Sequence, residues 1–293
     1  MKRIPKFPII FFFFFVFITV NARVSKEEKQ ILKELYDATN GQSWVHTWDF
    51  KKKVDTWHGI VVENGHVVEI NLHKNGLEGT IPSSLGDLSR LRVLNLAFNK
   101  LTGPIPISLV QLHYLEKLKL EMNSLSGMLP SSFKRAKNLK ELSLFNNLLE
   151  GGVPEGIGEA TELTILNLSS NYLSGELPKN IETLTKLESL ELFGNKLSGT
   201  ISADLGKLRS LRELVLSYNG FEGYLPQSVS GLSQLKFVQL QGNNFASIRA
   251  LLHLDADGLS TFDSDDLFLN MKFGKDKLSR IGIADSKFED VED

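Results

Sequence analysis

The 293-residue chain contains no cysteine. Disulfide bridges, thiolate zinc sites and cysteine nucleophiles are therefore excluded. The His-Glu-x-x-His zinc motif, a Gly-x-Ser-x-Gly elbow and a phosphate-binding loop ending in Gly-Lys-Ser or Gly-Lys-Thr are also missing. The formal net charge is only −2, without a long basic run, so there is no electrostatic footprint for nucleic acid. These absences predict a protein that is not an enzyme and has no metal or cofactor.

Long apolar runs are confined to the amino terminus. Three basic residues within the first six positions precede an apolar stretch at residues 9–20, and residues 20–22 suit a signal-peptidase cut. The apolar stretch is about 12 residues long, whereas a membrane-spanning helix needs roughly 20. We therefore predict that residues 1–22 are a cleaved signal peptide, with retention as an anchor left open, and that the protein is secreted to the extracellular space.

A repeat of 24 residues dominates the rest of the chain. Residues 91–106 give the frame LxxLxLxxNxLxGxIP, and the frame begins again at residues 67, 115, 139, 163, 187, 211 and 235. A period held this long indicates one structural unit stacked on copies of itself, which is a solenoid. Apolar residues two apart, such as Leu94 and Leu96, share one face of a short strand, so the stacked repeats predict a parallel sheet.

One asparagine in each repeat follows the strand, where the chain must turn inward. Its side-chain amide both donates and accepts hydrogen bonds, so it can satisfy backbone groups that the bend leaves open. We therefore assign these asparagines a role in stability and not in catalysis. The eight residues are Asn75, Asn99, Asn123, Asn147, Asn171, Asn195, Asn219 and Asn243.

The frame resembles the leucine-rich repeat, and its Gly-x-Ile-Pro ending is similar to the subtype in secreted and receptor proteins of plants. The resemblance covers residues 67 to about 250. It implies an α/β repeat solenoid, a superhelix with a parallel β-sheet on the concave face and short 3-10 or irregular segments on the convex face. It also implies a continuous asparagine ladder through the core. Plant members usually close the amino-terminal cap with paired cysteines, so this chain must cover its first strand in another way.

Residues 23–66 are predicted to form that amino-terminal cap from a helix and a hairpin. Ser25 with Glu28 resembles a capping box that opens a helix, and Gly41 is expected to stop it. Residues 57–70, with an Asn-Gly turn, are typical of a hairpin that leads into the first repeat. Three tryptophans are interpreted as an apolar lid over the sheet edge in preference to a ligand site: Trp44, Trp48 and Trp57.

The frame decays after the last asparagine. We therefore assign residues 67–250 to about eight repeats and residues 251–293 to a carboxyl-terminal cap with an acidic tail. Aspartates between residues 255 and 266 raise the alternative of a calcium site. Gly258, however, is the fourth residue of a loop begun at Asp255, whereas an EF-hand loop needs glycine at the sixth, so the acidic tail is favoured.

Recognition is expected on the exposed side of the strands, where side chains vary without harming the core. Large apolar groups held in water are informative there, and aromatic anchors often dominate binding energy. The alternative is that these side chains pack on one another and stiffen the sheet. The predicted partner-binding residues are Phe98, Met122, Phe145, Phe193, Tyr218 and Phe237, with the charged residues Lys119, Glu121 and Glu191 among those that orient the partner.

One glycosylation acceptor falls on this surface. Asn167-Leu168-Ser169 fits the sequon, and Asn167 is expected on the exposed side of its strand. A glycan there would cover the middle of the expected site. Either the residue is unmodified, or the partner approaches from one end or one flank.

Three functions remain open at this stage. The first, which the resemblance implies, is a secreted recognition protein, expected to be monomeric, that binds a protein or peptide on its concave face in signalling or defence. Its partner could be a membrane receptor or a secreted enzyme. The second is an inhibitor of a secreted hydrolase, similar to the polygalacturonase-inhibiting proteins of plants. The third is a cell-wall or matrix component that docks on polysaccharide.

Overall fold

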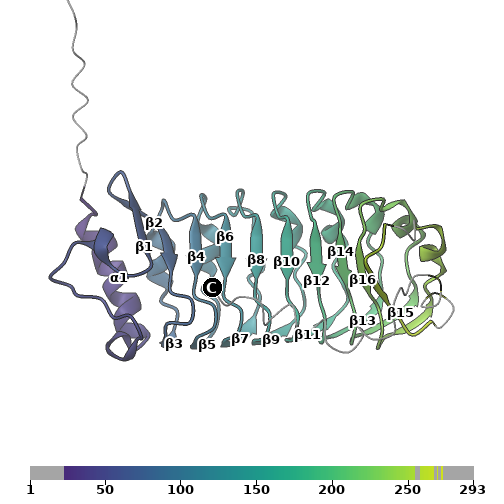
Figure 1. Ribbon diagram of the computed structural model, residues 1–293, viewed down its shortest axis with the longest axis horizontal. Helices are drawn as coiled ribbons and strands as arrows, with labels where there is room; N and C mark the ends of the chain where they lie inside the picture. The colour runs from purple at the N-terminus through teal and green to yellow at the C-terminus, as the bar shows by residue number, and fades with distance from the viewer. Residues whose placement is uncertain (1–22, 255–257, 267–268, 270–271, 273–293) are drawn as a thin grey trace, which may run out of the picture.

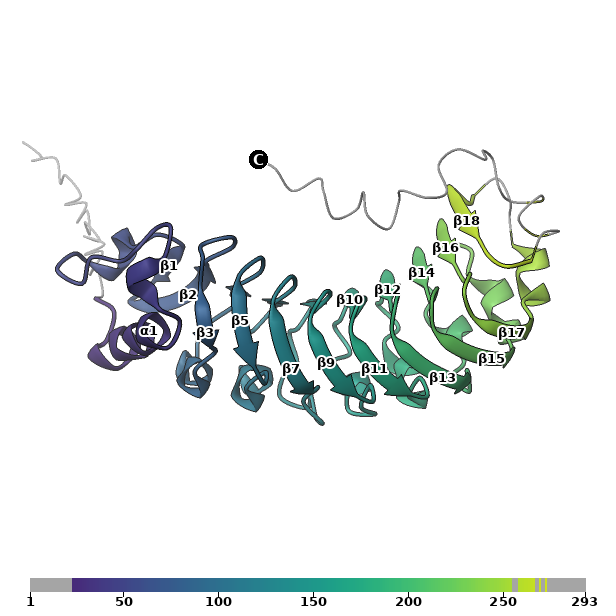
Figure 2. The same cartoon turned by 90° about the horizontal axis from the view of Figure 1, so that it is seen from below.

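The computed structural model describes residues 23–254, 258–266, 269 and 272. These residues form a curved solenoid with a ten-stranded sheet on its inner side and 3-10 helices on its outer side (Figures 1 and 2). The predicted repeat solenoid with a parallel concave sheet is thereby confirmed. The expected signal peptide and most of the expected acidic tail lie outside the described residues.

The amino-terminal cap begins with helix α1, Lys26–Ala38. The Ser25 hydroxyl accepts a hydrogen bond from the Glu28 backbone N–H at 3.1 Å, as in a capping box. The Glu28 carboxylate turns inward instead of completing the box, and it accepts the Val67 N–H at 2.8 Å. The helix ends three residues before the expected stop at Gly41, and Asn40 takes the left-handed conformation that reverses the chain.

The predicted hairpin follows two short 3-10 helices, η1 Gly41–Ser43 and η2 Val54–Thr56. Its strands are β1, Ile60–Glu63, and β2, His66–Asn71, and they pair antiparallel. The three tryptophans are buried beside them. The Trp44 and Trp48 rings lie 4.9 Å apart edge to face, and the Trp48 and Trp57 rings stack at 5.0 Å. This aromatic cluster covers the first repeat without any disulfide.

The inner sheet contains one short strand from each repeat. From β2 onward all neighbouring strands are parallel, and each leucine pairs with its equivalent 24 residues later, such as Leu94 with Leu118. The strands after the hairpin are β4 Val93–Asn95, β6 Lys117–Lys119, β8 Glu141–Ser143, β10 Ile165–Asn167, β12 Ser189–Glu191, β14 Glu213–Val215, β16 Phe237–Gln239 and β18 Thr261–Asp263. The order is β1-β2-β4-β6-β8-β10-β12-β14-β16-β18.

A second sheet, which the sequence analysis did not anticipate, runs beside the first. It has eight strands in sequence order, and neighbouring strands share only two or three residue pairs. Its strands are β3 Glu78–Thr80, β5 Lys100–Gly103, β7 Ser124–Met128, β9 Leu148–Gly151, β11 Tyr172–Gly175, β13 Lys196–Thr200, β15 Gly220–Tyr224 and β17 Asn244–Ser247. The chain then returns over the outer side through the 3-10 helices η3 Ser83–Asp87, η4 Ile107–Gln111, η5 Ile157–Glu159, η6 Lys179–Thr183, η7 Leu205–Lys207, η8 Gln227–Gly231 and η9 Arg249–His253.

The asparagines hold each bend against its neighbour, and Asn147 shows the pattern. Its Nδ2 donates to the Leu144 carbonyl in its own repeat and to the Leu120 carbonyl in the preceding repeat, both at 3.0 Å. Its Oδ1 accepts the Leu125 N–H at 3.0 Å. The same three kinds of bond recur at 24-residue intervals through Asn243. Every such amide therefore joins two repeats.

Both ends of this ladder are closed by other groups. At the amino end, the Asn75 Oδ1 accepts the His46 backbone N–H at 2.8 Å. At the carboxyl end, the Asp265 carboxylate accepts the Gly242 N–H at 2.8 Å, whereas the equivalent N–H of Tyr218 donates to the Gln241 backbone carbonyl of the following repeat. Strand β18 also continues the inner sheet beyond residue 250, because the buried Leu259 stands 24 residues after Leu235.

We expect Asn147→Ala to lower the free energy of unfolding by roughly 1–3 kcal/mol, because buried backbone groups in two repeats would lose their partners. Chemical denaturation followed by circular dichroism measures the change. Asn244→Ala, at an exposed asparagine of β17, is the matched control and should have little effect. Equal stability of the two variants would contradict the role given to the ladder.

Candidate functional site

Three rows of side chains run along the concave face, because alternate residues of each inner strand point toward it. In one repeat the three positions are Lys117, Lys119 and Glu121. A fourth row lies one residue before each asparagine. The ribbon shows that the inner strands face the open side of the arc (Figure 2).

The fourth row has a left-handed backbone in every repeat, which the sequence analysis did not foresee. Gly194 and Gly242 occupy it where φ is 63° and 69°. Phe98, Met122 and Tyr218 adopt φ of 57°, 55° and 54° at the equivalent positions. For residues other than glycine this conformation costs about 1–2 kcal/mol. These three large side chains are therefore held in a conformation that glycine adopts without that cost.

Two of the predicted aromatic residues, Phe193 and Tyr218, are brought into contact, and Phe98 and Met122 contact other side chains. The Phe193 and Tyr218 rings meet edge to face with centroids 5.4 Å apart, and 55% of Tyr218 is exposed. The Phe98 ring lies 4.9 Å from the His73 ring. The Asn146 amide nitrogen lies 2.7 Å from the Met122 sulfur. Phe145 and Phe237 are partly exposed in the same concave rows.

A cluster of charges occupies the amino-terminal half of the face. Lys119 Nζ lies 3.3 Å from Glu141 Oε1 and 3.6 Å from Glu121 Oε1, and Lys117 Nζ lies 3.7 Å from Glu141 Oε2. Burial disfavours the Lys119 ammonium, but the Glu121 and Glu141 carboxylates outweigh this effect and raise its pKa. Lys119 is therefore charged, and internal partners hold it in place.

Glu121 was expected as a surface charge that orients a partner, but it is only 4% exposed. Its Oε2 has no hydrogen-bond partner among the described residues. Burial raises the pKa of this carboxyl, although Lys119 acts in the opposite direction. The residue belongs to the floor of the face and not to its contact surface.

Carboxylates also lie close together in the carboxyl-terminal half. The Ser189 hydroxyl oxygen lies 2.8 Å from Glu191 Oε1 and 3.1 Å from Glu213 Oε2. At the twelve positions of the three concave rows in repeats 163–242, the sequence has no lysine or arginine. This half of the face therefore presents negative charge beside the Phe193–Tyr218 pair.

Asn167 stands in a concave row, on the side of its strand that was expected, but it is buried there. Only 6% of the residue is exposed, and its Nδ2 donates to Glu191 Oε2 at 2.9 Å. Its Oδ1 accepts the Ser169 N–H at 3.0 Å. Since Nδ2 is the atom that would carry a sugar, this packing counts against an occupied glycosylation site in the folded protein.

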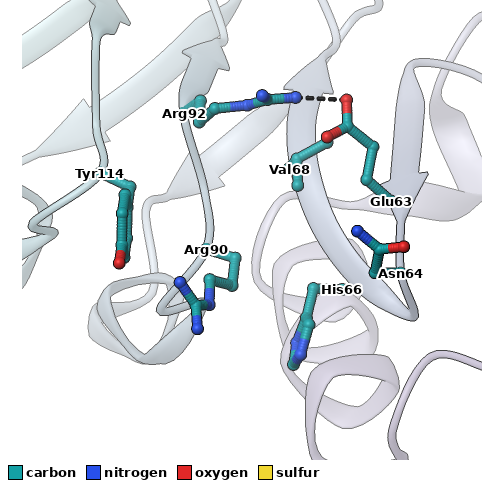
Figure 3. Close-up of a pocket in the computed structure, with 7 residues that line it drawn as sticks. All are labelled: Glu63, Asn64, His66, Val68, Arg90, Arg92 and Tyr114. Atoms are coloured by element: carbon teal, nitrogen blue, oxygen red, sulfur yellow. Dashed lines mark hydrogen bonds and ion pairs between the residues drawn. The ribbon is translucent and has the colours of Figure 1, made fainter.

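A hollow of about 470 Å³ lies beside the first repeats, where the inner strands begin (Figure 3). Arg92 and Glu63 point toward one another and form an ion pair. The Arg90 guanidinium lies over the Tyr114 ring, 4.9 Å from its centroid. Because arginine presents its donors in a fixed fork, the hollow suits an anionic group. The hollow was not predicted from the sequence, although Arg90 and Tyr114 share one repeat position.

Among the described residues, no group of three or more histidine or acidic side chains is placed to hold a metal ion. Within the same part of the chain, no helix has the length and apolar character that a membrane crossing requires.

Comparison with known families decides the identity of the repeats. Models described as leucine-rich repeat match residues 65–125, 113–173, 186–208 and 210–232, which together make up more than half of the chain. The chain belongs to the leucine-rich repeat family. This leucine-rich repeat protein combines an inner parallel sheet, an asparagine ladder and two end caps.

Similar proteins include receptors of plants. Phytosulfokine receptor 2 of Arabidopsis thaliana is 33% identical over 93 residues, which are 30% of this chain and 9% of the receptor. The crystal structure of PEPR1–AtPEP1 matches with a TM-score of 0.70 and 27% identity, over 75% of this chain and 32% of that chain. The plant peptide hormone receptor RGFR1 in complex with RGF2 matches with a TM-score of 0.59 and 31% identity, over 61% and 29%. The chain thus spans about a third or less of each of them.

We expect Glu121→Gln to raise the free energy of unfolding at pH 7. Because the folded-state pKa of Glu121 is raised, the folded protein binds this proton at pH values at which the unfolded chain has lost it. Stability from this group is therefore present below the unfolded pKa of about 4.5 and is lost as pH rises through the folded pKa.

Urea denaturation of the wild type and of Glu121→Gln at a series of pH values between about 4 and 8 tests this expectation. The advantage of the variant should grow as pH rises across this range. Glu222→Gln, at an exposed carboxylate of β15, is the control. A Glu121→Gln variant that is less stable than the wild type at pH 7 would show that the contact with Lys119 outweighs the burial of the charge.

Proposed function

We propose that this leucine-rich repeat protein acts outside the cell as a monomeric recognition module that catalyses no reaction and binds a peptide or protein segment on its concave face. The observation that carries the proposal is the Phe193–Tyr218 pair, whose ring centroids lie 5.4 Å apart and in which 55% of Tyr218 is exposed to solvent. Large aromatic side chains exposed in this way are typical of binding surfaces. The likeness to a peptide hormone receptor in complex with its ligand supports the same conclusion.

The main anchor is the Phe193–Tyr218 pair. Its rings are in contact, and both side chains stand on a sheet whose bends are hydrogen-bonded to neighbouring repeats. Aromatic side chains fixed in this way bind with little loss of conformational entropy. Phe145 and Phe237 extend the apolar surface to both sides along the concave rows.

The negative charge near the Phe193–Tyr218 pair indicates which kind of partner segment binds on this half of the concave face. The Glu191 and Glu213 carboxylates meet at the Ser189 hydroxyl, in the same two neighbouring repeats as the Phe193 and Tyr218 rings. A lysine or arginine of the partner would be attracted to this pair, while an apolar neighbour would pack on the Phe193 and Tyr218 rings. We therefore propose a partner segment that combines a basic side chain with an apolar or aromatic one.

Capture from an extracellular extract, followed by affinity measurement on the partner identified, tests this proposal. The Phe193→Ala/Tyr218→Ala variant should bind the partner at least about tenfold more weakly, because two central anchors are lost. Tyr172→Ala/Tyr224→Ala, at two exposed tyrosines of the second sheet, is the matched control and should bind normally. Glu191→Gln/Glu213→Gln should weaken binding mainly at low salt.

If the Phe193→Ala/Tyr218→Ala variant keeps both its melting temperature and its full affinity, this pair is not the anchor of the binding site. Capture of a secreted hydrolase that loses activity in the complex would instead favour the inhibitor function.

A further inference from the structure

The outer surface of the amino-terminal cap carries two rows of cations that the concave site does not use. Lys26, Lys29 and Lys33 stand at helical spacing on one face of α1. Lys51, Lys52 and Lys53 form a second row in the loop before η2, and all three are exposed. The cap lies at one end of the arc, apart from the middle of the inner sheet (Figure 2).

The two rows border two adjoining hollows. One, of about 350 Å³, is lined by the helix row and Phe50. The other, of about 550 Å³, is lined by the loop row together with Arg23 and Val54. Lys29 lines both hollows, and we call the two hollows together the basic groove. Seven cations border it, and Asp55 is the one carboxylate among the lining residues of the two hollows.

Two of the four acidic residues of α1 are engaged by other groups, whereas Glu27 stands beside Lys26. The Glu28 carboxylate is buried against the Val67 N–H and the His66 ring. The Glu34 carboxylate accepts a hydrogen bond from the Gln30 amide nitrogen at 3.3 Å. The cations of the groove repel one another, and a bound anion would relieve this repulsion. This local positive charge contrasts with the net charge of the whole chain, which is −2.

We propose that the basic groove binds a linear anionic polysaccharide, a chain of sugars that carry carboxylate or sulfate groups. The helix row from Lys26 to Lys33 extends over about 10 Å at 1.5 Å per residue, and the loop row adds a second line of charge. A small anion would meet only two or three of these cations. A polymer with regularly spaced charges can meet both rows.

The floor of the groove favours sugars over other polyanions. The Phe50 ring lies edge to face with the Tyr36 ring, at 4.9 Å between centroids, and with the Trp57 ring, at 5.1 Å. Together with Val24 and Val54 it forms an apolar floor on which the C–H faces of sugar rings can pack. None of the exposed large apolar side chains of the described residues lines the groove, so an inserting membrane contact is not favoured.

Binding of the whole secreted chain to immobilised polygalacturonate and dextran sulfate, over a series of salt concentrations, tests the proposal. The variant Lys51→Gln/Lys52→Gln/Lys53→Gln should lose at least about tenfold in affinity at low salt and show a shallower salt dependence, because three counterion-releasing contacts are removed. Neutral dextran should not be bound.

The control variant Lys100→Gln/Lys134→Gln/Lys137→Gln removes the same charge from exposed lysines of the repeats and should retain the wild-type affinity. Lys26→Gln/Lys33→Gln should weaken binding like the loop variant. Equal losses in the control and loop variants, or no binding to either acidic polysaccharide, would overturn the proposal. Tighter binding to duplex DNA or to phosphatidylserine vesicles at the same salt would also overturn it. The Phe193→Ala/Tyr218→Ala variant should bind polysaccharide normally. Failure of the proposed concave site can therefore be distinguished from failure of the basic groove.

Discussion

The hydrogen bonds of one asparagine amide to the backbone of two successive repeats are the interaction on which the rest of the structure depends. A parallel sheet built from three-residue strands has too few ladder bonds to fix the bends between its strands. The asparagine amide supplies the additional hydrogen bonds. At Asn171, Nδ2 donates to the Leu144 and Leu168 carbonyls, and Oδ1 accepts the Leu149 N–H. Each bend therefore has the same conformation as the next one, and these hydrogen bonds constrain each repeat to a length of 24 residues.

This constraint also places the functional surfaces. Because every bend has the same conformation, the residue before each asparagine is left-handed throughout, and it carries Phe98, Met122 or Tyr218 toward the concave side. Because stacking leaves two open edges, the ends need caps. The amino-terminal cap supplies tryptophans, a hairpin and α1, and α1 also presents the basic groove. The recognition that we propose for the concave face and the polysaccharide binding that we propose for the cap would thus use separate parts of one scaffold.

The fold could be predicted from sequence because its signals are local and repeated. Apolar spacing and the recurring asparagine predicted the stacked sheet, and the Asn-Gly turn predicted the hairpin of β1 and β2. What escaped prediction depends on contacts between neighbouring repeats. The strands of the second sheet have at most one buried apolar residue each, such as Leu101 in β5 and Leu125 in β7, so they show no apolar alternation. Asn167 is buried where its amide donates to Glu191 of the next repeat, and β18 was missed because the residue 24 positions after Asn243 is leucine and not asparagine.

Amide hydrogen exchange of the intact protein tests the central claim most directly. The backbone N–H groups of Leu125, Leu149 and Leu173 each donate to an asparagine Oδ1 of the following repeat. If the amides lock the bends together, these three protons exchange only through global unfolding and are among the slowest in the chain. Exchange as fast as that of the exposed turn at Asn64 would show that the ladder does not hold the repeats together.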